Sequence, residues 1–148
     1  MVMKSPSQKS PWLAVVIHFL GLLPLFLLAF DYLLDNLSIN PIQDIEQRLG
    51  RAALYLLVGT LAVTPLATLT GWRSLPPHRR KLGLYAFMVF SLHFITFAVL
   101  DYGLNLREIF RLTLEKPFIL LGSLAGLILL LLAITSFDFF KRKMGKHW

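Results

Sequence analysis

The chain has 148 residues, of which 56% are hydrophobic and 16% are charged, and its formal net charge is +7. Its mean hydropathy of +0.66 excludes a water-soluble globular domain, whose helices carry charges every few residues along their outer faces. Cysteine is absent, which excludes disulfides, thiolate metal sites and cysteine nucleophiles.

Four uncharged stretches run through the sequence, at residues 10–30, 52–72, 82–100 and 117–137. Each has 19 or 21 residues. As a helix, such a stretch is about 30 Å long, which matches the hydrocarbon thickness of a bilayer. We therefore predict an all-α membrane protein, a single domain over residues 1–148 whose four transmembrane helices form an antiparallel up-down bundle. The predicted spans are about 11–31, 51–71, 82–100 and 117–138.

Basic residues are unevenly distributed around the spans. Ten Lys and Arg residues flank the spans on the side of the two termini, and five lie in the loops on the other side. By the positive-inside rule, both termini are expected in the cytoplasm. Because these cations gather at the ends of spans, the lipid bilayer with its anionic headgroups is their expected partner, and nucleic acid is not.

The outer loops carry helix-start signals. Asn40 followed by Pro41 predicts a short interfacial helix that leads into the second span through Gly50. Asn105 predicts a second amphipathic helix before the fourth span. The connection between spans 2 and 3 is short and turn-like, so these two spans are predicted to be antiparallel neighbours.

Small and helix-distorting residues within the spans predict packing features. Gly122, Gly126 and Ala133 follow the small-xxx-small pattern of helix contacts, although a Leu-rich span matches that pattern often by chance. Thr64-Pro65 predicts a structural kink in the second span rather than an ion site.

Histidines are the strongest candidates for chemistry. The uncharged stretches lack the ionised side chains of proton pumps, charge-coupled transporters and voltage sensors, but they contain His18 and His93. By helix rise, His93 is about 18 Å from one boundary and about 12 Å from the other. Each of the two either bonds a carbonyl or hydroxyl of a neighbouring helix or ligates haem iron. His78 and His147 are interpreted as solvated.

The residues predicted to surround His93 fit both interpretations, haem ligation and a hydrogen bond to a neighbouring helix. Its face contains Ala86, Val89, Phe90, Thr96 and Phe97. One small position between aromatic side chains suits a flat macrocycle, and it suits ordinary packing equally well. No His-x-x-x-His or Glu-x-x-His spacing occurs, so a chelating helical metal site has no support.

Several motifs, in order along nearly the whole chain, carry a resemblance. They are Trp12-Leu13, His18, Gly21-Leu22-Leu23-Pro24, Asn40-Pro41, Asp44-Ile45, Gly50-Arg51, Thr64-Pro65-Leu66-Ala67, Arg79-Arg80-x-Leu82-Gly83-Leu84, Leu92-His93 and Arg142-Lys143-x-Gly145-Lys146-x-Trp148. With these motifs the chain resembles the MsrQ (YedZ) family, within the ferric reductase-like transmembrane proteins. This family is the haem-binding membrane subunit of the periplasmic protein-methionine-sulfoxide reductase system.

The resemblance implies a b-type haem carrier in a bacterial-type inner (plasma) membrane, which passes electrons to a periplasmic molybdenum-containing reductase of methionine sulfoxide. The family's deep haem-ligand histidine corresponds to His93 (haem iron), and His18 also matches a family position. At the outer rim, Arg51 or Arg48 is a candidate partner for the haem propionates. The donor is expected to be quinol or a cytoplasmic flavin reductase, and the sequence does not indicate whether FMN is bound.

The chain departs from the family pattern at its end. Family members continue beyond the motif that ends here at Trp148, into two further spans that supply the other haem histidines. By helix rise His18 and His93 differ in depth by about 9 Å, too far for both to bind one iron without strong tilt. A haem with one histidine, a ligand from a partner, and no haem at all are the three alternatives. The alternative function is a cofactor-free accessory or structural subunit of a larger membrane complex.

Overall fold

The computed structural model describes residues 11–72 and 74–136, and within them it contains helices and no strand. The elements are α1 (Pro11–Leu33), α2 (Pro41–Thr70), η1 (Pro76–His78), α3 (Arg79–Ile95), η2 (Thr96–Asp101), α4 (Leu106–Glu115) and α5 (Pro117–Ser136). η1 is a 3-10 turn, and η2 is a π-helical continuation of α3. α1, α2, the continuous unit Pro76–Asp101 and α5 are long and apolar enough to cross a membrane, which confirms the predicted fold class.

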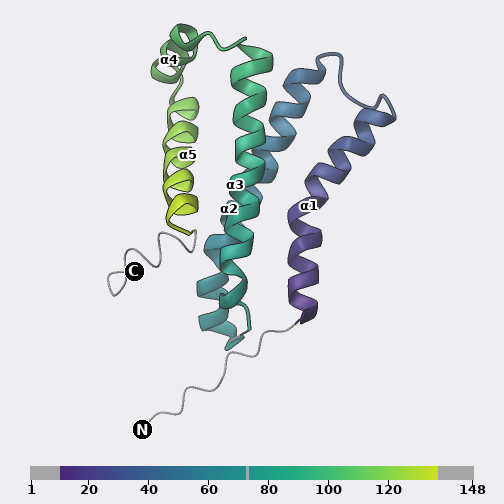
Figure 1. Cartoon of the computed structure of the whole chain (residues 1–148), viewed down its shortest axis with the longest axis vertical. Helices are drawn as coiled ribbons and strands as arrows, with labels where there is room; N and C mark the ends of the chain where they lie inside the picture. The colour runs from purple at the N-terminus through teal and green to yellow at the C-terminus, as the bar shows by residue number, and fades with distance from the viewer. Residues whose placement is uncertain (1–10, 73, 137–148) are drawn as a thin grey trace.

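The four long helices alternate in direction. Figure 1 shows α2 and α3 in the middle of the molecule, with α1 on one side and α5 on the other. α1 packs on both α2 and α3, whereas α5 packs on α3 and α4. We call the end of the bundle that carries η1 the turn end, and the opposite end, which carries α4, the α4 end.

α2 is longer than the predicted second span. Asn40 caps its start by accepting a hydrogen bond from the Gln43 amide at 3.4 Å, as predicted, and Pro41 takes the first helical position. The short interfacial helix expected before Gly50 is not separate, because residues Pro41–Thr70 form one helix of 30 residues. A glycine inside a helix costs only about 1 kcal/mol, which is too little to break a helix that packs on a neighbour.

Arg48 ties α1 to α2 at the α4 end. Its Nε and Nη2 donate to the two carboxylate oxygens of Asp44 at 2.9 and 3.1 Å, and its Nη1 donates to Asp31 of α1 at 2.5 Å. All three side chains are at most about one third exposed. Partial burial and the forked geometry make this ion pair stronger than a fully solvated one. Arg48 therefore serves to hold the first two helices together.

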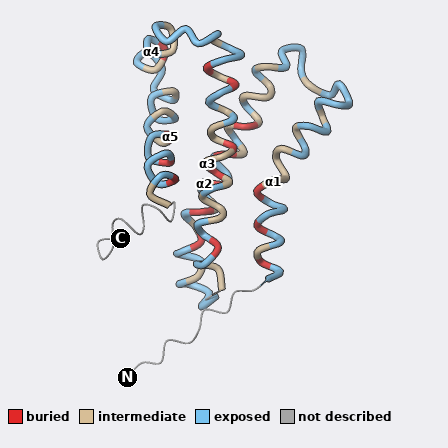
Figure 2. Tube along the Cα trace, in the orientation of Figure 1, coloured by how far each residue is buried: buried red, intermediate tan, exposed pale blue. Residues whose placement is uncertain are grey.

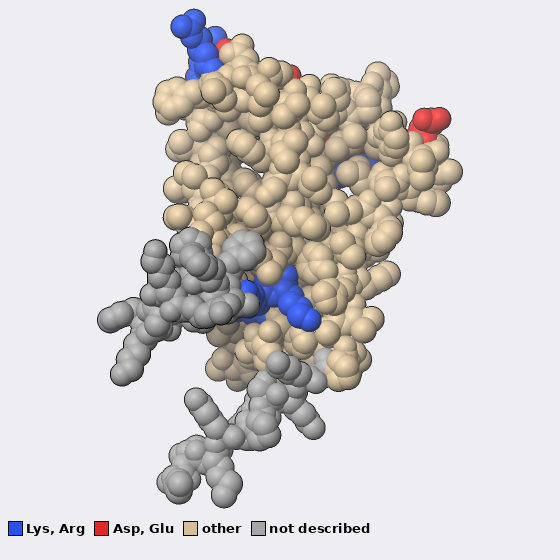
Figure 3. Space-filling model, in the orientation of Figure 1, with Lys and Arg blue, Asp and Glu red and all other residues tan. Residues whose placement is uncertain are grey.

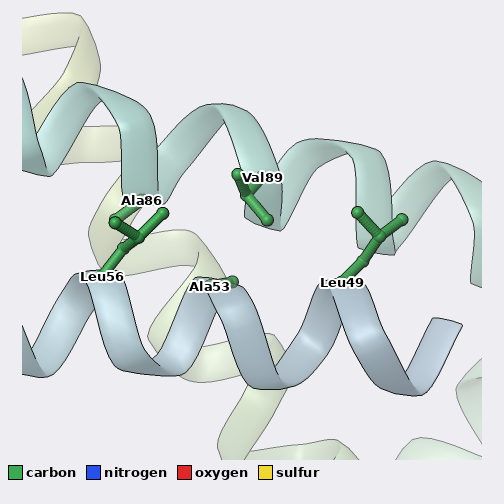
Figure 4. Close-up of a cluster of buried hydrophobic side chains, with 5 residues drawn as sticks. All are labelled: Leu49, Ala53, Leu56, Ala86 and Val89. Atoms are coloured by element: carbon green, nitrogen blue, oxygen red, sulfur yellow. The ribbon is translucent and has the colours of Figure 1, made fainter. Parts of the chain in front are cut away.

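The interface of α2 and α3 is the core of the molecule. Leu49, Ala53 and Leu56 of α2 meet Ala86 and Val89 of α3 (Figure 4). Their spacings of three and four residues place each set on one helix face. Small side chains let the two backbones approach closely. The contact confirms the prediction that these two spans are neighbours. Figure 2 shows buried residues on the inward faces of the helices, while the outward faces are exposed and apolar, as lipid contact requires.

α5 meets α3 through one of its glycines. Gly126 and Ala133 are buried, and a Cβ added at Gly126 would overlap the ring of Phe90. At Gly122 an added Cβ would meet no atom within 4 Å. The predicted small-residue stripe is thus a helix contact at Gly126 and is buried at Ala133, but Gly122 takes no part in it.

α4 is the second short helix predicted from the sequence. Asn105 caps it by accepting a hydrogen bond from the Glu108 amide at 3.3 Å. Its buried side chain is Leu112, and Arg111 on the exposed face pairs with Glu115 at 2.7 Å. The helix packs on α5 and lies at the end of the bundle where α5 begins.

Gly21 allows α1 to approach α3, and this contact yields a stability prediction. A Cβ at Gly21 would overlap the first ring atoms of Tyr85, which rotation of the ring moves little. Gly21→Ala should therefore destabilise the fold by roughly 1–3 kcal/mol through overpacking. Gly59→Ala is the matched control, since nothing lies within 4 Å of its added Cβ. Thermal unfolding in detergent measures both, and equal melting temperatures for the two variants would contradict this packing.

Candidate cofactor site

His93 lies on α3 with its imidazole against α2. Its Nδ1 is 2.9 Å from the backbone carbonyl oxygen of Glu46. Because a carbonyl oxygen only accepts hydrogen bonds, Nδ1 must carry the proton and donate it. In the neutral ring, Nε2 then keeps its lone pair, which is the state that binds a metal ion.

Gly50 makes room for this ring. A Cβ at Gly50 would lie 3.1 Å from Cε1 of His93 and 3.3 Å from its Nδ1, closer than side chains normally pack. Glu46 and Gly50 are one helical turn apart, so the acceptor and the open position face the same side of α2. α2 thus fixes both the orientation and the tautomer of His93.

A small cavity borders His93 between α3, α4 and α5. Its volume is about 180 Å³, and its wall consists of Glu46, Phe90, His93, Phe94, Phe97, Ile109, Phe118, Ile119, Gly122 and Ser123. Aromatic rings dominate this wall, so most of the cavity surface is apolar. Alone it is smaller than the roughly 300 Å³ at the lower end of small-molecule sites.

A larger, polar cavity adjoins the first one at the α4 end. It measures about 470 Å³ and shares Glu46, Phe97, Phe118 and Ile119 with the cavity at His93. Lys116, Asp101 and Tyr102 also line it. Burial raises the pKa of the Tyr102 phenol, and the nearby Asp101 carboxylate adds to this, so the phenol stays protonated and able to donate. Together the two cavities lead from His93 toward the α4 end.

His18 occupies a different part of the bundle. It is exposed on α1 and shares a 2.5 Å hydrogen bond between its Nδ1 and the Tyr85 hydroxyl of α3. Tyr85 precedes His93 by eight residues on α3, which is about 12 Å of helix. The structure therefore does not bring His18 and His93 together, and each of them bonds a polar group of a neighbouring helix.

The candidate arginines of the rim lie outside the two cavities. Arg51 is exposed and donates from Nε to the Gln47 carbonyl oxygen at 3.3 Å, and Arg48 is held by its two carboxylates. Neither lines a cavity beside His93, whereas Lys116 lines the outer one. Lys116 follows α4 in the sequence, and only the fold reveals that it approaches the second and third spans.

The structure corrects the interpretation of His78. This residue was expected in solvent, but only 5% of its surface is exposed, and among the described residues neither ring nitrogen has a hydrogen-bond partner. The physical reason is that the Pro76-Pro77 turn closes as a 3-10 helix that packs on α1 and α2, which covers the imidazole. His147, also interpreted as solvated, lies outside the described residues.

The donor set would suit a haem held by a single histidine rather than a multi-ligand metal site. Among residues 11–72 and 74–136, no three His, Cys, Asp or Glu side chains cluster in a way that could hold a metal ion. Among these residues, His93 alone combines a free ring nitrogen, Nε2, whose protonation is set by the hydrogen bond at Nδ1, with a position beside an aromatic cavity. Sequence reasoning missed the roles of Glu46 and Gly50, because a backbone carbonyl leaves no sequence signal and Gly50 was interpreted as the entrance to a span.

Comparison with known proteins places this arrangement in a family. Residues 49–148 match the sequence model of the ferric reductase like transmembrane component. The match covers most of the chain and includes α2 from Leu49 onward, α3 with His93, and α5. No solved structure matches the fold. The chain belongs to the ferric reductase-like transmembrane family, and it is a multi-pass membrane protein whose family suggests a role in transmembrane electron transfer.

Proposed function

We propose that the protein is an electron-transfer subunit that binds haem b through His93. The observation that carries the proposal is the Nδ1 hydrogen bond to the Glu46 carbonyl, because it leaves Nε2 as the basic nitrogen of a ring that lines an apolar cavity. Metal-bound histidines commonly have such a partner on the second nitrogen. The family membership supports an electron-transfer role for this site.

The residues around His93 would each have a defined task. A haem, when bound, would supply an iron that accepts and releases one electron. The Glu46 carbonyl holds the imidazole in one orientation, and Gly50 leaves space for it. Phe90, Phe94 and Phe97 would exclude water from His93. This lowers the local dielectric constant and so influences the reduction potential of a bound haem. Lys116 in the outer cavity is a cation suited to a carboxylate such as a propionate.

We further propose that the electrons leave at the α4 end. The resemblance to the MsrQ family supports a periplasmic molybdenum-containing reductase as the acceptor, with the α4 end in the periplasm and both termini in the cytoplasm. The acceptor's reaction consumes two electrons and two protons to convert methionine sulfoxide into methionine and water. Quinol or a flavin reductase would supply electrons from the turn end.

Among the described residues, only His93 would hold the iron of a bound haem. His18 bonds Tyr85 far from His93, and His78 is buried at the turn end. A further ligand to the iron of a bound haem would come from a group outside these residues.

The second candidate function is a cofactor-free accessory subunit of a larger membrane complex. One observation favours it: the cavity at His93 is only about 180 Å³, and the imidazole already has a hydrogen bond that would satisfy a structural histidine. In this case the bond serves to join α3 to α2. The two functions can be told apart because only the first gives a coloured protein.

Visible absorption spectroscopy separates these two functions. The purified chain, produced with a haem supply, should show a Soret band, and His93→Ala should lower haem content by more than about tenfold, since loss of supporting groups alone commonly costs that much. His18→Ala is the matched control and should keep its haem. A colourless wild-type protein, or equal loss in both variants, would refute His93 as the ligand.

The tautomer of His93 can be tested without any cofactor. In the haem-free protein labelled with ¹⁵N, the imidazole signal that disappears in His93→Asn should show a protonated Nδ1 and an unprotonated Nε2. The physical reason is the carbonyl acceptor at Nδ1. The opposite tautomer would mean that the hydrogen bond to Glu46 does not exist in the membrane-protein sample.

Electron delivery is tested with a reconstituted system. Vesicles that contain the protein, a quinol donor and a periplasmic molybdenum-containing methionine sulfoxide reductase should produce methionine, and His93→Ala should reduce the rate at least about tenfold by removing the ligand. The rate with His18→Ala should stay within about twofold of wild type. If His93→Ala kept full activity while wild type bound haem, the haem would not be on the path.

A further inference from the structure

A third cavity lies at the turn end, away from His93. It measures about 460 Å³ and is formed by α2, α3 and α5. Its apolar lining includes Leu57 and Leu61 of α2, Leu84 of α3, and Leu129 and Leu132 of α5. This size is within the range of small-molecule sites, and the apolar walls suit a hydrocarbon chain.

Two arginines from the start of α3 also line this cavity. Arg79 donates from Nη1 to the Thr64 hydroxyl at 3.2 Å. Arg80 donates from Nε to the Ser136 hydroxyl at 2.9 Å and from Nη2 to the Ser136 carbonyl oxygen. In the part of the chain that the structure describes, Arg79 has no carboxylate within ion-pair distance, and the cavity wall contains no acidic residue. Arg79 thus gives this largely apolar cavity a cationic edge.

The level of Arg79 along the bundle axis supports a lipid-headgroup site. Arg79 pairs with Thr64, which precedes the end of α2 at Thr70 by six residues, or about 9 Å of helix. Figure 3 shows a blue patch of Lys or Arg side chains above the lower end of the molecule, whereas the red Asp and Glu side chains of this face lie toward its upper end. Positive charge at this level, next to apolar walls that continue toward the membrane centre, matches a headgroup with its acyl chains.

We propose that this cavity binds an anionic phospholipid. The phosphate lies at the guanidinium group of Arg79, and an acyl chain runs between α2 and α5 against the leucines. Guanidinium groups bind phosphate oxygens through charge-assisted hydrogen bonds, and basic pockets between transmembrane helices are known lipid-headgroup sites. Hydroxyl and carbonyl partners already orient both arginines, so little side-chain freedom is lost on binding.

Native mass spectrometry of the full chain in detergent tests the proposal. The probes are phosphatidylglycerol and phosphatidylcholine with identical acyl chains. We expect phosphatidylglycerol to bind at least about tenfold more tightly, and Arg79→Gln to remove most of that preference. Arg107→Gln on exposed α4 is the matched control and should leave it unchanged. Leu61→Trp keeps both arginines but fills the cavity, so it should weaken both lipids.

The outcomes distinguish the sources of the phosphate group. Inorganic phosphate that competes with the lipid at equal concentration would overturn the proposal in favour of a soluble anion, because the acyl chain would then contribute nothing. Equal affinity for the two lipids, or full binding in Arg79→Gln, would also overturn it. A loss of haem from Arg79→Gln with lipid binding intact would assign the arginine to the cofactor instead. A melting temperature equal to wild type shows that each variant is folded.

Discussion

The close contact between α2 and α3 is the constraint on which the rest of the molecule depends. Within a bilayer, backbone groups have no water to bond, so helices associate through tight packing and a few interhelical hydrogen bonds. Ala53 and Ala86 keep the two backbones close. Only at that separation can His93 reach the carbonyl of Glu46, and only a glycine at position 50 leaves the ring its space. The candidate ligand is therefore a product of helix packing.

Much of this fold could be predicted from the sequence because the bilayer fixes the length of an apolar helix. The four spans, the Asn40 and Asn105 caps and the α2–α3 pairing follow from local rules of hydropathy, capping and loop length. The same rules failed at Gly50, where they indicated a break between two helices. There the local preference is small, and the contact with His93 lies more than forty residues away in sequence.

The candidate site was predictable only in part, for a similar reason. His93 stands out because a histidine in an uncharged span is rare, and its depth follows from counting residues. The role of Lys116 depends on where α4 returns the chain to the bundle, and no pattern in the sequence indicates that. His78 shows the opposite case: a polar residue between prolines and basic residues resembles a solvated turn, yet the turn folds inward and buries it.

α5 lines both the cavity at His93 and the cavity at the turn end. Its contact at Gly126 with Phe90 lies between the cavity at His93, which it lines with Gly122 and Ser123, and the turn-end cavity, which it lines from Leu129 onward. A helix is nearly rigid over two turns, so a tilt of α5 about this contact would widen one cavity while it narrows the other. An occupant of the turn-end cavity would therefore hold α5 at a fixed angle. By the same geometry it would fix the wall that faces His93, although the two cavities share no residue.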